Sequence, residues 1–138
     1  MQPIPYLFFR GTAEEAVRAY ARIFNSPDPQ IMHVGDAPES MPGAQPHHVM
    51  HAAVQVGDGM IYASDYADAT DMAGTCIAVT GKTPEESRRM FDALKEGGVI
   101  QMELQPTFWS PAFGQLTDRW GTRWMVDTEN PAHQAAAE

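Results

Sequence analysis

The chain has 138 residues, of which 43% are hydrophobic and 20% charged, and its formal net charge at pH 7 is -9. This length and composition predict one compact globular domain and exclude a disordered chain. With 18 Asp and Glu against 9 Lys and Arg and no basic run, the chain is not expected to bind nucleic acid or a membrane surface. No apolar run reaches membrane-spanning length, no signal peptide is evident, and Cys76 is the only cysteine, so we expect a cytoplasmic protein.

The first half of the chain begins with an apolar strand at residues 4–9, which we expect to be buried on both faces. A helix follows, capped by the Thr12 hydroxyl and the Glu15 carboxylate, with one apolar stripe at positions 13, 16, 17, 20 and 24. A short strand at 31–34 and a loop at 35–46 come next. Strands at 49–56 and 60–64 form a predicted hairpin around the turn Gly57-Asp58-Gly59.

The second half repeats this plan after a small, polar segment at 65–74 that reads as a linker. A strand at 75–80 precedes a helix that begins with Thr83, Pro84 and Glu86 and ends near residue 96. Strands at 99–104, 113–117 and 122–126 follow, and residues 128–138 read as a tail. PYLFFRGTAEEAVRAY at 5–20 thus returns as CIAVTGKTPEESRRMF at 76–91. The repeat predicts an α+β fold of two βαβββ modules, 3–66 and 74–127, with helices on the convex side of a curved mixed sheet.

Several segments resemble the PhnB-like branch of the glyoxalase, bleomycin-resistance and extradiol-dioxygenase superfamily, also called vicinal oxygen chelate. They are PYLFF-x-G-x-AEEA, MHAAVQVGDGMIYASD, FDALKEGG and TFWSPAFGQLTDRWGTRWMV, and the last is the most specific because it holds aromatics and glycines at fixed spacing. The resemblance covers nearly the whole chain and implies a homodimer of glyoxalase-like domains. Some members carry a demethylubiquinone methyltransferase description, but this sequence has no Gly-rich nucleotide loop after a strand and no room for a cofactor-binding βαβ domain.

The superfamily also implies a divalent metal held by His and Glu side chains in the concave side of the sheet. In this chain the implied ligand positions fall at about Pro5, Cys76 and Met125, and the strand at 59–64 contains neither His nor Glu. Proline has no donor atom in its side chain, methionine is a poor ligand for hard ions, and one thiol does not make a four-ligand shell. We therefore expect that the chain has no metal at these positions and needs no cofactor.

Three residues are candidates for acid, base or nucleophile roles. His51 belongs to a cluster with His47 and His48, and positions 47 and 51 of one strand would share a face, so a relocated metal site stays open beside a role for His51 in the pocket. Cys76 is either a buried thiol or a nucleophile. Asp65 closes the central hairpin, where turn chemistry competes with catalysis as its explanation.

Arg123 lies two residues before Met125 and is expected on the same concave face, where a guanidinium would anchor a carboxylate or phosphonate. Trp109 lies in a loop that either closes the cavity or packs in a dimer interface. The full set of expected ligand-binding residues is Leu7, Phe9, His51, Tyr62, Cys76, Trp109, Arg123 and Met125. We expect a protein that binds a small organic molecule in an apolar cavity without metal, and the alternative is a metal-dependent lyase or dioxygenase with a relocated His site.

Overall fold

The computed structural model describes residues 1–39 and 43–131 of the chain. It divides into two compact units, Met1–Thr70 and Asp71–Glu138. The division falls inside the segment 65–74 that the sequence marks as a linker. Each unit contains the predicted βαβββ order, so the α+β fold with two mixed sheets is confirmed.

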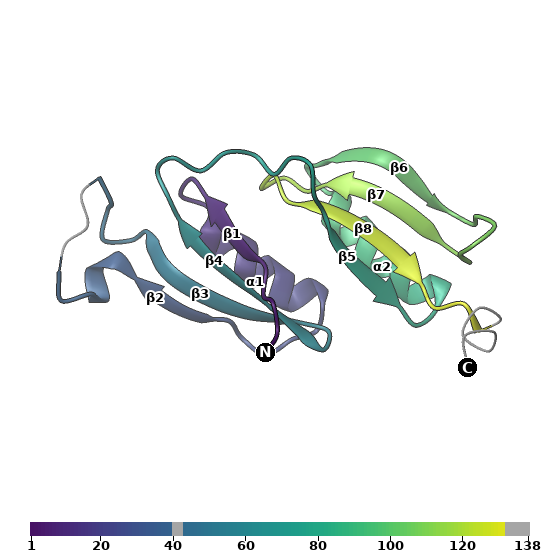
Figure 1. The fold of residues 1–138 in the computed structure, drawn as a ribbon, viewed down its shortest axis with the longest axis horizontal. Coiled ribbons are helices and arrows are strands. Elements are labelled where there is room, and N and C mark those ends of the chain that lie inside the picture. The colour runs from purple at the N-terminus through teal and green to yellow at the C-terminus, as the bar shows by residue number, and fades with distance from the viewer. Residues whose placement is uncertain (40–42, 132–138) are drawn as a thin grey trace. The chain divides into compact units, whose positions relative to one another are not determined.

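The first unit consists of a four-stranded sheet with one helix on one of its faces (Figure 1). Its elements are β1 (Tyr6–Phe9), α1 (Ala13–Ile23), β2 (Gln30–His33), the 3-10 turn η1 (Val34–Asp36), β3 (Val49–Val56) and β4 (Gly59–Asp65). The strand order is β1-β4-β3-β2, with β1 parallel to β4 and the other pairs antiparallel. The crossover through α1 is what allows β1 to lie parallel to β4 in the same sheet.

The second unit repeats this arrangement (Figure 1). Its elements are β5 (Ile77–Gly81), α2 (Pro84–Lys95), β6 (Val99–Gln105), β7 (Phe113–Thr117) and β8 (Arg123–Thr128). The strand order is β5-β8-β7-β6, and β5 is parallel to β8. In both units, therefore, the first and last strands lie side by side, and one face of the sheet is covered by the helix.

The cores lie between each helix and its sheet. In the first unit the predicted helix stripe is buried at positions 13, 16, 17 and 20, where Val17 and Tyr20 have no exposed surface, whereas Phe24 follows the helix and is half-buried. In the second unit the side chains of Phe91 and Trp124 are fully buried between α2 and the sheet. Burial of large apolar side chains at these positions accounts for the choice of helix face, since each contributes about 1.5–3 kcal/mol when removed from water.

The start of α1 differs from the prediction. Thr12 is the N-cap residue, but its side chain makes no capping hydrogen bond. Instead, the Asp65 carboxylate accepts from the backbone N–H groups of Gly11 at 2.9 Å and Ala13 at 3.0 Å. The predicted cap by the Thr12 hydroxyl is therefore wrong, and a carboxylate from β4 bonds the backbone at the start of α1.

The start of α2 follows the prediction. The Thr83 hydroxyl accepts from the backbone N–H of Glu86 at 3.1 Å, and Pro84 is the first helical residue. At the other end of the chain, Thr128 is only 3% exposed and belongs to β8, so the predicted tail begins too early. Residues 132–138 of that tail lie outside the described residues. Among the described residues, neither helix has the length and apolar composition that a membrane span requires.

Candidate functional site

The face of the first sheet that α1 does not cover is lined by aromatic side chains. In β1, Leu7 and Phe9 are buried at 7% and 4% exposure, whereas Tyr6 and Phe8 are 40% and 53% exposed. The strand is therefore buried on one face only. The prediction that Leu7 and Phe9 line the cavity is wrong in this structure, because successive side chains of a strand point to opposite faces and these two lie in the core.

Two of the predicted binding residues, His51 and Tyr62, do meet on this open face. Tyr6 is the register partner of Tyr62, and its hydroxyl lies 3.1 Å from Nδ1 of His51. The ring centroids of His51 and Tyr62 are 4.9 Å apart in an edge-to-face arrangement, and those of Tyr6 and His51 are 5.6 Å apart. Strands β1, β3 and β4 thus bring three ring side chains together.

Tyr6 was not predicted as a site residue, although the internal repeat contains the signal. Both first strands lead to a glycine, Gly11 in the first unit and Gly81 in the second. Counting back five residues from each glycine pairs Tyr6 with Cys76. Pro5, which the sequence placed opposite Cys76, precedes β1 and is not a strand residue. The sequence alignment paired Cys76 with Pro5 instead of Tyr6 because Gly81 lies three residues before α2, whereas Gly11 lies two residues before α1.

The open face of the second sheet contains a pocket of about 320 Å³. Two of the predicted site residues line it: Cys76, just before β5, and Arg123, the first residue of β8. Two amide side chains that the sequence did not single out, Gln101 of β6 and Gln115 of β7, complete its polar lining. Their positions depend on strand pairing between distant segments, which the local pattern does not show.

Arg123 is the only charged residue among those that line this pocket. Its neighbours in the chain are Thr122 and Trp124, which are buried, so the half-buried Arg123 points to the opposite, open face. Within residues 1–39 and 43–131 its guanidinium makes no hydrogen bond or ion pair. Among the described residues, this cation therefore lies in the pocket without a counter-ion.

Two other predicted residues of the second unit do not line this pocket. Met125 follows on the same face of β8 and pairs with Ala78 and Gln115. Trp109 is 42% exposed, and its ring packs edge-to-face against Phe113 at 5.3 Å. Neither side chain lines the pocket of the second unit.

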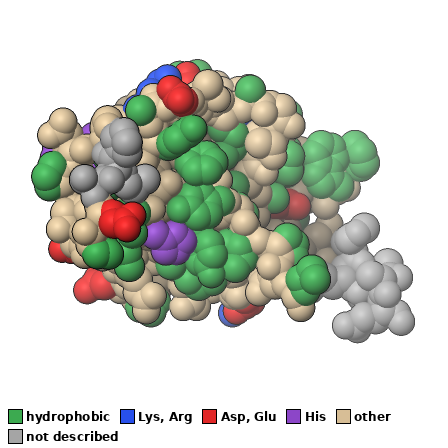
Figure 2. All heavy atoms as spheres, turned by 60° about the vertical axis from the view of Figure 1, so that its left-hand side comes forward, with side chains coloured by type: hydrophobic (Ala, Val, Ile, Leu, Met, Phe, Trp, Pro, Cys, Tyr) green, Lys and Arg blue, Asp and Glu red, His purple; other side chains and the backbone are tan. Residues whose placement is uncertain are grey.

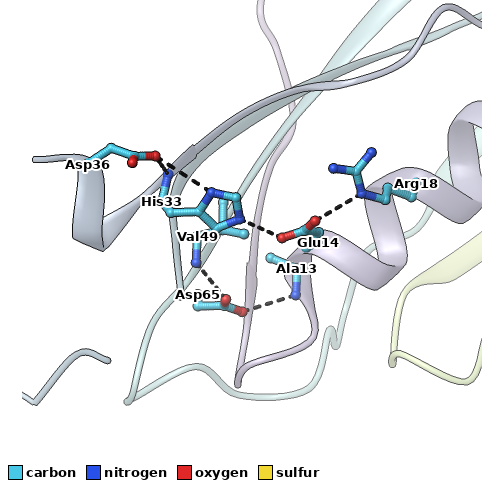
Figure 3. A network of polar contacts seen from close by, with 7 residues as sticks. All are labelled: Ala13, Glu14, Arg18, His33, Asp36, Val49 and Asp65. Carbon is cyan, nitrogen blue, oxygen red and sulfur yellow. Dashed lines mark hydrogen bonds and ion pairs between the residues drawn. The ribbon is translucent and has the colours of Figure 1, made fainter. Parts of the chain in front are cut away.

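Asp65 has a structural role in the first unit. Besides the start of α1, its carboxylate accepts from the backbone N–H of Val49 at 2.9 Å (Figure 3). It therefore links the β1–α1 loop, the first turn of α1 and the first residue of β3. With three backbone donors on one carboxylate, the geometry favours the turn-and-capping explanation over catalysis.

The remaining histidines of the predicted cluster do not converge on His51. The rings of His47 and His48 contact each other at 4.6 Å, and Nδ1 of His48 accepts from the backbone N–H of Gln45. Within residues 1–39 and 43–131, no group of three or more His, Cys, Asp or Glu side chains is arranged to hold a metal ion.

A separate ionic network joins α1 to β2 (Figure 3). Nε2 of His33 lies 2.6 Å from the Glu14 carboxylate, which also accepts from Arg18, and Nδ1 of His33 lies 3.7 Å from Asp36. The bond to Glu14 raises the pKa of His33 above its ordinary value. The same bond, with that from Arg18, lowers the pKa of Glu14.

Comparison with known proteins places the chain among bacterial relatives of the same length. Protein YjdN of Escherichia coli (strain K12) is 28% identical over 135 residues, covering 89% of this chain and 92% of YjdN. The crystal structure of protein PA1353 from Pseudomonas aeruginosa is 37% identical with a TM-score of 0.85, covering 94% of this chain and 98% of PA1353.

Two further comparisons concern the family and its fold. A PhnB protein from Bacillus cereus is 26% identical with a TM-score of 0.77, covering 94% of this chain and all of that one. The fosfomycin resistance protein FosX from Listeria monocytogenes, at 13% identity and a TM-score of 0.66 over 99% of this chain and 97% of FosX, shares the fold. Residues 2–127 match the family described as 3-demethylubiquinone-9 3-methyltransferase. The chain therefore belongs to that family, resembles a PhnB protein over 94% of its length, and has the fold of a glyoxalase/bleomycin resistance protein.

Proposed function

We propose that this protein binds a small organic molecule with a carboxylate or phosphonate group in the pocket of the second unit, without a divalent metal. The observation that carries the proposal is the Arg123 guanidinium, which lines the pocket and has no counter-ion among the described residues. A guanidinium presents its N–H groups in a planar fork that matches both anions, so a bound anion would supply the missing partner.

The rest of the pocket suits a small ligand. A volume of about 320 Å³ lies at the lower end of the range for small-molecule sites. The side-chain amides of Gln101 and Gln115 offer both donors and acceptors, and Cys76 adds a polarizable thiol. These neutral groups would orient the ligand, while Arg123 supplies the charge.

The alternative is a metal-dependent lyase or dioxygenase that uses the histidine cluster. The observed contacts speak against it, since His51 is bonded to Tyr6 and His48 to a backbone N–H. The equivalent first-strand positions carry Tyr6 and Cys76, and Met125 is in β8. A phenol, a thiol and a thioether are a poor donor set for the hard divalent ions of extradiol and lyase chemistry.

We further propose that the protein is a homodimer and that the loop before β7 contributes to the interface. The Phe108 side chain is 96% exposed, and its ring lies edge-to-face against Trp109 with ring centroids 4.7 Å apart. A second copy would remove this aromatic surface from water. Analytical ultracentrifugation should find a dimer, and Phe108→Ser should shift it toward the monomer; a wild-type monomer would contradict this assignment.

The ligand proposal is tested by calorimetric titration with phenylphosphonate, benzoate and neutral benzyl alcohol, each in the presence and absence of EDTA. The two anions should bind more tightly than the alcohol, and EDTA should change nothing. Arg123→Gln should weaken anion binding about 10- to 150-fold, the equivalent of one hydrogen bond to a charged group. Arg123→Lys should recover part of the loss, because it restores the charge without the fork.

Lys82→Gln is the matched control, since it removes the same charge from an exposed position of the second unit outside the pocket. Equal weakening by Lys82→Gln would mean that net charge, and not the pocket, governs binding. Anion binding that requires added Mn²⁺, or a stoichiometric divalent ion in protein purified without chelator, would refute the metal-free proposal and favour the alternative.

A further inference from the structure

One methionine sulfur of this protein is part of a hydrogen bond to the backbone. Apolar side chains reach the surface in several places (Figure 2), and the methionines Met32 and Met102 are 47% and 36% exposed. Met72, in the segment before β5, is half-buried, and its Sδ accepts from the backbone N–H of Arg123 at 3.4 Å. The sulfur therefore contacts the backbone of the one charged residue that lines the pocket of the second unit.

This contact lies where the pairing of β5 with β8 begins. Ile77 is the first residue of β5, and its register partner is Trp124, so Arg123 precedes the paired residues. At that point the Met72 sulfur supplies an acceptor in place of a strand partner. Within residues 1–39 and 43–131, residues 72–75 make no backbone–backbone hydrogen bond. The bond to Met72 is therefore what ties this stretch to β8.

The same stretch forms part of the wall of the pocket, because residues 74–76 line it. On one side of the stretch, Asp71 lies against the turn before β8, where a Cβ on Gly121 would be 3.6 Å from its Oδ1. On the other side, Ile77 is paired with β8. Residues 72–76 thus span two fixed points, and a displacement of the Met72 side chain moves the wall between them.

Oxidation of the sulfur is incompatible with this contact. In the reaction with hydrogen peroxide a sulfur lone pair attacks one peroxide oxygen, an S–O bond forms, the O–O bond breaks, and the second oxygen leaves as water with both protons. The sulfur is oxidised to the sulfoxide and the peroxide is reduced. A gap of 3.4 Å between Sδ and the Arg123 nitrogen has no room for the added oxygen, since an N–H···O bond alone needs about 2.7–3.2 Å. If the oxygen points elsewhere, the sulfur carries a partial positive charge and no longer accepts.

We propose that Met72 is an oxidation site at which hydrogen peroxide releases residues 72–76 from β8 and opens the wall of the pocket. Reduction of the sulfoxide restores the contact. The release itself needs no ligand. Its effect on anion binding rests on the proposed function: a displaced wall leaves a bound anion with fewer contacts, so phenylphosphonate should bind more weakly to the oxidised protein.

The test compares the full-length wild type with two variants before and after treatment with hydrogen peroxide, which is then removed with catalase. Dithiothreitol follows, so that an oxidised Cys76 returns to the thiol, and peptide mass spectrometry measures the sulfoxide at each methionine. Amide hydrogen exchange of Arg123 should become about 2- to 5-fold faster in the oxidised wild type. This is the lower part of the range for one neutral hydrogen bond, because a thioether is a weak acceptor. The Cys76 thiol should also react faster with iodoacetamide.

Met72→Leu keeps an apolar side chain and removes the acceptor. Arg123 should therefore exchange faster in the untreated variant, and peroxide should change neither Arg123 nor Cys76. Met102→Leu is the matched control, because it removes an oxidisable sulfur from an exposed position of the same unit outside the pocket, and it should respond to peroxide as the wild type does. Methionine sulfoxide reductases for both epimers should reverse the change in the wild type. The amide spectrum verifies the fold of each variant.

Four results would overturn the proposal. They are unchanged Arg123 exchange although Met72 is oxidised, slower exchange because the sulfoxide oxygen has become the acceptor, an equal response of Met72→Leu to peroxide, and a Met72 that stays reduced while Met32 and Met102 are oxidised. If phenylphosphonate does not bind the untreated wild type, the anion proposal fails. The exchange and alkylation measurements still decide the role of Met72 in that case, because neither uses a ligand.

Discussion

Replacement of Asp65 by Asn should destabilise the first unit without a direct effect on ligand chemistry. One oxygen of Asp65 accepts from Gly11 and Ala13, and the other accepts from Val49. Asparagine keeps the shape but offers one acceptor oxygen and one NH₂ group. In the best orientation it retains the two bonds to the start of α1, weakened by the loss of charge, and turns a donor toward the N–H of Val49.

The magnitude follows from these bonds. A hydrogen bond to a charged group contributes about 1.5–3 kcal/mol, and an unsatisfied buried donor costs about 1–3 kcal/mol. The loss of one bond and the weakening of two should therefore lower the free energy of unfolding by about 2–4 kcal/mol. For a chain of this length that corresponds to a fall in Tm on the order of 10 °C.

Urea unfolding followed by circular dichroism measures this change, and Asp68→Asn provides a control at an exposed position of the same unit. We expect the control to remain within about 0.5 kcal/mol of the wild type, as is usual for surface substitutions. If Asp65→Asn unfolds with the same free energy as Asp68→Asn, Asp65 does not anchor the start of α1 and β3. Unchanged stability with lost ligand turnover would instead restore Asp65 as a catalytic candidate.

Three other tests concern separate parts of the fold. The bond between His33 and Glu14 raises the pKa of His33 and lowers that of Glu14. It stabilises the folded state only while the His33 ring is protonated and the Glu14 carboxylate is ionised. The stability lost in His33→Gln should therefore be largest between the ordinary pKa values of 4.5 and 6.5 and shrink on both sides in a pH series of urea unfolding curves. Thr83→Ala should cost about 1 kcal/mol in unfolding free energy, whereas Thr12→Ala, which removes no capping bond, should cost less. Gly114→Ala would place a Cβ 2.8 Å from a core phenylalanine ring and should lower the unfolding free energy by about 1–3 kcal/mol.

Controls for two of these tests lie in the first unit. His47→Gln changes an exposed ring outside the network and should show no such pH window. Gly59→Ala places its Cβ 3.7 Å from the nearest atom and should be tolerated. A flat pH profile for His33→Gln, or equal costs for Thr83→Ala and Thr12→Ala, would contradict the assigned contacts.

Local patterns in the sequence were sufficient to predict the elements of this fold. The apolar stripe of α1, the cap of α2 and the Gly57-Asp58-Gly59 turn each depend on residues a few positions apart, and the structure has all three. The repeat of strand, glycine and helix predicted two βαβββ units for the same reason. It also placed Cys76 and Arg123 on one face, because the alternation of β8 between polar and buried residues is visible in the sequence.

The tertiary structure decided what local patterns left open. Strand β1 reads Tyr-Leu-Phe-Phe, and four apolar residues in a row contain no alternation to show which pair faces α1. Only packing against α1 buries Leu7 and Phe9 and leaves Tyr6 beside His51. The start of α1 was likewise decided at a distance, since the Asp65 carboxylate that holds it comes from the far end of the unit. Strand pairing brings the Asp65 carboxylate to the start of α1 and the amides of Gln101 and Gln115 to the pocket of Arg123. The register of this pairing is set by the burial of whole sheet faces and not by residues that are neighbours in the sequence.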